Sequence, residues 1–191
     1  SVKSTRKITK AMQMVAAAKL RKAQENAESS RPYAERMNMV LSNLASKYKD
    51  NNNSPSLLSG TGKDDVILFL VSTSERGLCG GFNSSIVKLA KNSIKSSLND
   101  NKQVKIITIG KKGKEQLSRD YENLIIDHID LSGIKKIDYN QSLKISKDVL
   151  NKFENNEFDV LKFFYSRFQS VISQIPMEKQ LIPATFEENE K

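Results

Sequence analysis

The feature that most constrains this chain is its first fifty residues, which contain no glycine and are dominated by strong helix formers. Ala, Lys, Met, Gln and Glu all favour helix. At about 1.5 Å per residue, one helix of this length would extend roughly 75 Å, far beyond the helices of ordinary compact domains. Pro32 lies inside the segment. We expect a bend or a brief break there, because proline removes a backbone donor.

Large apolar residues recur along this segment at steps of three and four. At about 100° per residue they fall on one side of the predicted helix, as in a coiled coil. They are Ile8, Met12, Val15, Tyr33, Met37, Val40, Leu44 and Tyr48, and we call them the seam. Residues 51–191 contain no second helical pattern of this length. The partner helix is therefore expected either in another chain or in a part cut from this one.

Positive charge is concentrated at the N-terminus. The formal net charge is +9, and residues 1–24 hold seven basic groups and no acidic one. The partner of this segment is expected to be acidic: nucleic acid, anionic lipid or an acidic protein surface. A nucleic-acid-binding helix would be expected to interleave aromatic residues with its basic ones, and none occurs before Lys22.

Several classes of protein are disfavoured by composition. The longest apolar run, Val66–Val71, is far too short for a transmembrane helix. Cys79 is the single cysteine and His128 the single histidine, which excludes an internal disulfide and leaves little for zinc chemistry or a Ser-His triad. Neither Glu75 nor the acids beside His128 show a pairing that supports acid–base catalysis. We expect His128 to be a surface residue, and we predict no catalytic residue, metal or cofactor.

After a polar linker, expected as a loop over residues 51–63, short apolar strands alternate with helical patterns. This alternation predicts an α/β fold: a Rossmann-like, mainly parallel sheet with covering helices. The predicted domains are a shaft helix at 1–50, the linker, and a central domain at 64–191. The expected strands are 66–71, 104–109, 124–126, 160–165 and 171–181, and the expected helices are 83–98, 112–119 and 139–153.

A glycine-rich turn joins the first strand to the first helix, where nucleotide-binding folds hold phosphate. The spacing of its glycines fits neither a Walker loop nor a dinucleotide fingerprint. We therefore predict a structural turn in which Asn83 or Ser84 caps the helix and Cys79 is buried. The turn is made by Gly77, Cys79, Gly80, Gly81 and Asn83.

Two blocks of sequence carry a resemblance to a known family. Residues 7–20 (KITKAMQMVAAAKL) resemble the N-terminal helix of the gamma subunit of F-type ATP synthases, and residues 72–83 (STSERGLCGGFN) resemble its central-domain signature. Residues 30–33 and 180–183 also match. Members of that family begin with a further turn of helix and end with a second long helix, antiparallel to the first. We expect both to be missing here, and that C-terminal helix would be the partner of the seam.

The resemblance implies a non-catalytic rotor subunit. Its shaft would turn inside a ring of alpha and beta catalytic subunits, and its globular domain would contact the epsilon subunit and the membrane ring of c subunits. It would couple proton-driven rotation to ATP synthesis. The shaft residues expected to face the catalytic subunits are Lys7, Lys10, Met12, Arg21 and Lys22.

The implied location is peripheral to a membrane. It would be the inner, cytoplasmic face of the bacterial plasma membrane or the matrix side of the mitochondrial inner membrane. The alternative function is a basic-helix nucleic-acid-binding module.

Overall fold

The computed structural model describes residues 2–48, 54–134 and 137–185. The chain divides into two compact units, of which one holds the N-terminal helix to Lys47 and the other starts at Tyr48. Within the described ranges a membrane-spanning helix is absent, since each helix is too short or too polar for a bilayer core.

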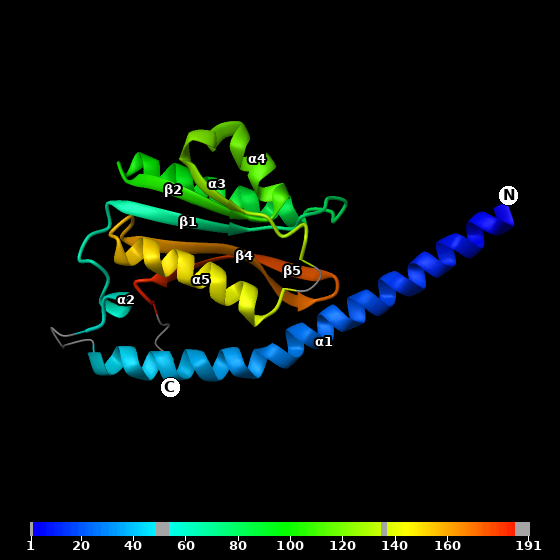
Figure 1. The fold of residues 1–191 in the computed structure, drawn as a ribbon, viewed down its shortest axis with the longest axis horizontal. Coiled ribbons are helices and arrows are strands. Elements are labelled where there is room, and N and C mark those ends of the chain that lie inside the picture. Colours follow the sequence, from blue (N-terminus) through cyan, green and yellow to red (C-terminus); the bar gives the residue numbers. More distant parts are fainter. Residues whose placement is uncertain (1, 49–53, 135–136, 186–191) are drawn as a thin grey trace. The chain divides into compact units, whose positions relative to one another are not determined.

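The N-terminal unit holds all but the last residue of the helix α1, Val2–Tyr48, which continues through Pro32 without a break. Figure 1 shows that its axis bends partway along. Pro32 has no N–H to donate to the carbonyl of Glu28 in the preceding turn. Just before it, the hydroxyls of Ser29 and Ser30 donate to the carbonyls of Asn26 and Ala27, both at 3.0 Å. Missing donors and serine bonds of this kind bend helices. The predicted bend is therefore present, and a break is not.

The second unit is a five-stranded sheet in the order β3-β2-β1-β4-β5. The strands are β1 (Val66–Ser72), β2 (Gln103–Ile109), β3 (Ile125–Ile129), β4 (Val160–Ser170) and β5 (Ser173–Ile182). β1 pairs in parallel with β2 and β4, and β2 with β3, whereas β4 and β5 are antiparallel. The predicted mainly parallel α/β fold is confirmed.

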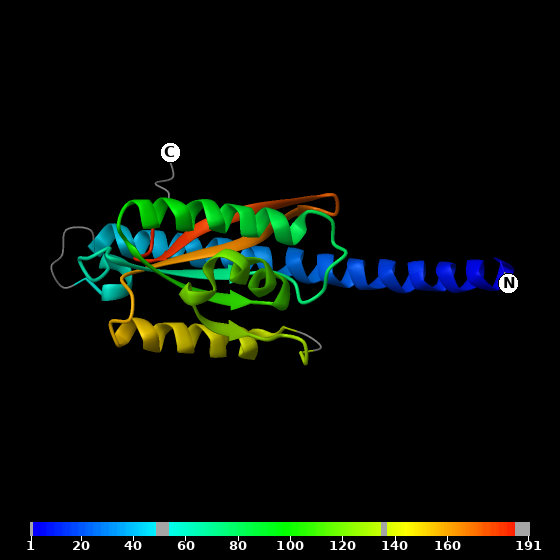
Figure 2. The same cartoon turned by 90° about the horizontal axis from the view of Figure 1, so that it is seen from above.

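Helices cover both faces of this sheet, which gives three layers within the unit. α3 (Phe82–Asn99) and α4 (Lys111–Tyr121) pack on one face, and α5 (Tyr139–Glu154) packs on the other. Figure 2 shows α3 and α5 on opposite sides of the strands. Successive β1 residues point to the two faces in turn: Phe69 and Val71 contact α3, and Leu68 and Leu70 contact α5.

Four sequence expectations need correction. The linker is not entirely a loop, because α2 (Ser56–Ser59) forms one helical turn after Pro55; its residues 51–53 lie outside the described ranges. β4 continues to Ser170, beyond the predicted end, because it pairs with β5 along most of its length. The last strand does not begin at Val171, since residues 171–172 form the turn between β4 and β5. Leu124 ends the short 3-10 helix η1 (Glu122–Leu124), so β3 begins one residue later than predicted.

A tight contact at the carboxyl end of β2 generates the first testable prediction. Gly110 has φ +85°, and a Cβ placed there would lie 2.2 Å from the carbonyl oxygen of Thr73. Gly110→Ala should therefore lower the free energy of unfolding by about 2–5 kcal/mol, through backbone strain and steric overlap. The measurement is urea denaturation followed by circular dichroism.

Gly133→Ala is the matched control, since a Cβ at Gly133 meets nothing within 4 Å. Equal stability of the two variants would contradict this account of Gly110.

Candidate functional site

The seam of α1 is exposed to solvent along the whole helix. The exposed fractions of its large apolar side chains from Ile8 to Leu44 lie between 40% and 67%. Burying a side chain of this kind contributes about 1.5–3 kcal/mol. The longest helix that the structure describes in residues 54–134 and 137–185 is α3, with 18 residues. The seam is therefore a surface that a second long helix would cover.

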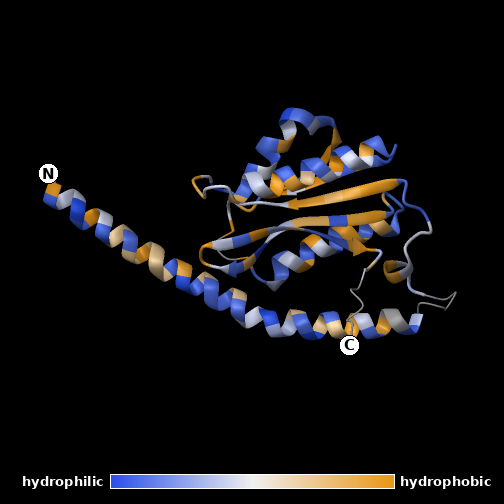
Figure 3. Ribbon diagram, turned by 180° about the vertical axis from the view of Figure 1, so that it is seen from behind, coloured by the Kyte–Doolittle hydropathy of each residue, from blue (hydrophilic) through white to orange (hydrophobic). Residues whose placement is uncertain are grey.

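Polar and small residues interrupt the seam in its middle. Between Val15 and Tyr33, the positions on this side are occupied by Lys19, Lys22 and Asn26, with Ala23 beside them. Figure 3 shows this stretch of α1 as a hydrophilic segment between two more apolar ones. A helix that packs here can approach closely at the alanines, but its contact with the middle of α1 is polar.

The five predicted partner-binding residues are all exposed, but they do not share one face. At about 100° per residue, Lys7, Lys10 and Arg21 lie together, whereas Met12 is about 180° from Arg21, on the side of the seam. Lys22 also lies on the seam side. Arg21 is paired with Glu25 one turn later, at 3.0 Å, in an exposed ion pair. The helix thus presents two surfaces, one basic and one apolar, which suit two different neighbours.

The glycine-rich turn is organised around Asn83, which is buried. Its Oδ1 accepts a hydrogen bond from the backbone N–H of Ser74 at 3.0 Å, and its Nδ2 donates to the Cys79 Sγ at 3.1 Å. α3 begins after Gly81 without a side-chain cap, and the Ser84 hydroxyl donates to the Gly81 carbonyl. The predicted capping role of Asn83 or Ser84 is wrong, because Asn83 instead ties the loop to the end of β1.

The outer part of this turn is exposed. Cys79 is exposed, so the prediction that it is buried is wrong. Leu78 is fully exposed and has φ +62°, and Gly80 has φ +58°. Gly77 and Gly81 flank these residues without a positive φ. The glycines give the loop its sharp turns, and the leucine between them projects into solvent.

The first amides of α4 are satisfied by three consecutive residues of the neighbouring loop. The N–H of Lys111 donates to Glu75 Oε2 at 3.3 Å, that of Lys112 to the Ser74 carbonyl at 3.2 Å, and that of Gly113 to Thr73 Oγ1 at 2.7 Å. Helix N-terminal amides with no internal partner are the groups that bind phosphate in nucleotide-binding folds. Here they are already occupied, with a carboxylate at the outermost one.

A shallow cavity beside these residues holds the remaining polar candidates. His128 and Asp130 line it, together with Glu75 and Lys111. His128 is half-buried rather than fully at the surface, and its Nδ1 lies 2.9 Å from the hydroxyl of the buried Thr108. Hydrogen bonds from Ser132 hold the pKa of Asp130 below its usual value, which favours the carboxylate form. The described residues contain no cluster of three or more His, Cys, Asp or Glu side chains suited to a metal ion.

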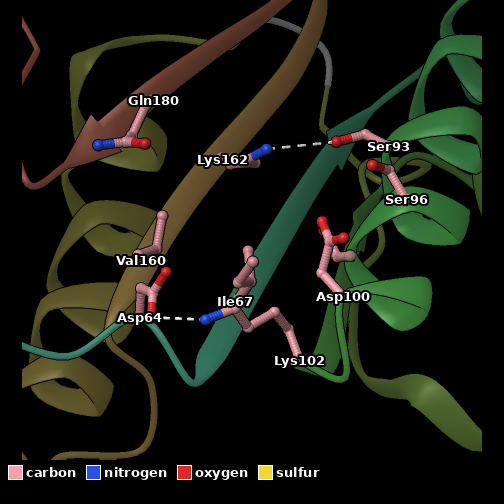
Figure 4. Close-up of a pocket in the computed structure, with 10 residues that line it drawn as sticks. Asp64, Ile67, Ser93, Ser96, Asp100, Lys102, Val160, Lys162 and Gln180 are labelled. Atoms are coloured by element: carbon pink, nitrogen blue, oxygen red, sulfur yellow. Dashed lines mark hydrogen bonds and ion pairs between the residues drawn. The ribbon is translucent and has the colours of Figure 1, made fainter.

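A second cavity, of about 270 Å³, lies at the amino ends of β1 and β4 (Figure 4). Lys102 and Lys162 line it, and each is already paired: Lys102 with Asp64 at 2.6 Å, and Lys162 with Glu178 at 2.9 Å. The hydrogen bond to Asp64 raises the pKa of Lys102 above its usual value. The two cations that line this cavity are therefore neutralised by the protein itself, and the cavity shows no preference for an anion.

Comparison with known proteins places the chain in a family. The sequence model of the ATP synthase family matches residues 1–191. The chain is 58% identical over 191 residues to the ATP synthase gamma chain of Jannaschia sp. strain CCS1, and 56% identical over 190 residues to that of Paracoccus denitrificans. It covers 64% and 66% of the lengths of these relatives.

A solved structure agrees with this. A chain in the central stalk and c-ring of the mitochondrial ATP synthase of Tetrahymena thermophila matches with a TM-score of 0.67 and 27% identity, over 92% of this chain and 72% of that one. The chain belongs to the ATP synthase gamma-chain family, as its two sequence blocks predicted.

Sequence reasoning missed Thr73 and Glu75 as organising residues. Their contacts reach Lys111, Gly113 and Leu131, which are 36–56 residues away in the sequence. Only the two glycines at 110 and 113 give a signal, because a side chain at either would overlap Thr73. Such a signal becomes interpretable only once the strands are known to be neighbours.

The exposed seam leads to a prediction about α1. In a chain that sedimentation shows to be monomeric, the amides of residues 8–25 should exchange with solvent faster than those of Val66–Val71. The reason is that a solvated helix opens locally at low free energy, whereas β1 opens with the core. Equal protection, measured by hydrogen exchange, would mean that α1 does not depend on a second helix.

The occupied amides lead to a second prediction. Titration calorimetry with ATP, ADP and NAD should give no saturable heat at a Kd tighter than about 0.1 mM, or about −5.5 kcal/mol. The glycine spacing of the turn fits no phosphate-binding motif, and Glu75 already bonds the first amide of α4. A saturable heat below that Kd would reopen the possibility of a nucleotide site.

Proposed function

We propose that this chain acts as the central-stalk rotor subunit of a rotary ATP synthase. It couples proton-driven rotation of a membrane ring to ATP synthesis on alpha and beta catalytic subunits, and it performs no chemistry itself. The family assignment supports this role, since the relatives are ATP synthase gamma chains. Support from the structure is the exposed seam on a 47-residue helix, with a separate basic face beside it.

The two faces of α1 suggest how the helix is used. The seam is taken up by a second long helix of the same subunit, which completes a two-helix shaft. The basic face, with Lys7, Lys10 and Arg21, meets the acidic surfaces of the catalytic subunits. Exposed ion pairs contribute about 0–1 kcal/mol each, so they can form and break as the shaft turns.

The rest of the chain serves as the base of the rotor. The division into a shaft at 1–50, a linker at 51–63 and a central domain at 64–191 is part of this proposal. The central domain contacts the epsilon subunit and the c ring, and the turn from Gly77 to Asn83 is structural. In a bacterium, the complex is peripheral to the inner, cytoplasmic face of the plasma membrane.

The alternative of a basic-helix nucleic-acid-binding module has less support. The basic stretch of α1 carries no aromatic residue before Tyr33, whereas modules for single strands use aromatic side chains to stack bases. The gamma-chain relatives favour the rotor instead.

Met12→Lys in the reassembled complex tests the shaft. In this proposal Met12 lies at the border of the seam, about 60° around the helix from Val15, where the second helix leaves it within reach of the acidic sleeve. A lysine there would form a new ion pair that holds one rotary state. An exposed ion pair contributes up to about 1 kcal/mol, which would slow escape from that state by up to about fivefold. The measurement is protons pumped per ATP hydrolysed, together with the rotation rate.

Met37→Lys is the control, because Met37 lies on the same side of α1 as Met12 and outside the predicted partner-binding set. Its exposed fraction is 40%, against 66% for Met12. Unchanged coupling in the Met12 variant would contradict the placement of Met12 against the catalytic subunits.

A further inference from the structure

The loop between β1 and α3 ends in an exposed tip, residues 76–80, whose backbone conformation is unusual. Leu78 has φ +62° and is fully exposed, and Gly80 has φ +58°. A leucine rarely adopts such a backbone, and it persists only where the surrounding structure holds it in place. Some set of contacts beneath the tip must therefore fix its conformation.

One side of the base of this tip is held by hydrogen bonds within the loop and to the first turn of α3. Asn83 accepts from the N–H of Ser74 and donates to the thiol of Cys79, so it spans the loop from its first to its last part. The Ser74 hydroxyl donates to the carbonyl of Arg76. These bonds close the loop on itself and tie it to the start of α3.

On the other side, the Ser74 carbonyl accepts from the N–H of Lys112, and Glu75 reaches two separate segments with its two oxygens. Oε1 accepts from the N–H of Leu131 at 2.7 Å, and Oε2 from the N–H of Lys111 at 3.3 Å. Leu131 follows β3, and Lys111 begins α4 after β2. One half-buried carboxylate thus joins the ends of three neighbouring strands, directly before the first residue of the tip.

We propose that Glu75 is the positioning residue that fixes the direction of the exposed Arg76–Gly80 tip. Only a carboxylate can serve both amides, because each of its oxygens is an acceptor and its charge suits a helix N-terminus. In Glu75→Gln, one of the two N–H groups faces an amide NH₂ and loses its acceptor. The inference deepens the proposed function, and only its coupling measurement rests on that function.

The first experiment measures backbone order in the full chain by ¹⁵N relaxation. In the parent, the amide of Leu78 should be rigid, with an order parameter of about 0.85, and in Glu75→Gln it should fall below about 0.6. Amides of the β1 core, such as Leu68 and Leu70, should stay rigid in both. A merely structural effect would instead lower stability across the core and leave the tip no more mobile than its surroundings.

Glu115→Gln is the matched control. Glu115 lines the same shallow cavity and bonds the side chain of Lys112, so the variant removes the same charge beside α4 but no acceptor of a loop amide. Glu75→Asp is a milder second variant that keeps the charge and shortens its reach. It should speed hydrogen exchange at Leu131 by about tenfold, equivalent to about 1.4 kcal/mol. A rigid Leu78 in both Glu75 variants would overturn the proposal.

The second experiment measures protons pumped per ATP hydrolysed in the reassembled complex. Glu75→Gln should lower this ratio and Glu115→Gln should not, if the fixed tip transmits force to a neighbouring subunit. A mobile tip with unchanged coupling would overturn its role in transmission while leaving the positioning result intact. Failure of the parent chain itself to couple would instead contradict the proposed function, so the two failures are distinguishable.

Discussion

The central domain depends on the burial of one strand, β1, on both of its faces. Five consecutive residues, Ile67–Val71, are each exposed by 7% or less. A strand without a solvent face requires neighbours on both edges and helices on both sides. β2 and β4 pair with the two edges of β1, α3 and α4 cover one face of the sheet, and α5 covers the other. Parallel pairing then brings the loops that follow β1, β2 and β3 to one edge of the sheet.

What could be predicted from the sequence follows from this burial. The continuous apolar run of β1 and the periodic pattern of α5 are local signals, and both elements lie where expected. The wrong predictions concern residues whose conformation depends on contacts with residues elsewhere in the sequence. Residues 166–170 are too polar to predict a strand, and they are extended because β5 pairs with them. Asn83 has the chemistry of a helix cap, but Ser74 at the end of β1 offers it a better-matched partner.

The two faces of α1 could be predicted from sequence only in part. The helix itself needs no tertiary contact to be recognised, since its residues favour helix for 47 positions despite Pro32. The residues that bind a partner are harder to assign, because one side chain can serve either face. Met12 is expected against the catalytic subunits, and the helical repeat also groups it with Ile8 and Val15 on the seam. Residue type indicates that a surface is used, but not by which neighbour.

The carboxyl edge of the sheet differs from that of a nucleotide-binding protein in a way that suits the proposed mechanical role. In nucleotide-binding proteins, this edge leaves amides open for a phosphate. Here Thr73, Ser74 and Glu75 occupy the first amides of α4, and Gly110 and Gly113 allow the close approach that this requires. Hydrogen bonds that would be intermolecular in an enzyme are thus intramolecular, and they stay formed whether or not a ligand is present. The first amides of α4 are thereby already bonded, and Glu75 joins the ends of three strands beside an exposed loop. In the proposed rotor, these bonds would let the domain transmit torque without deforming its loops.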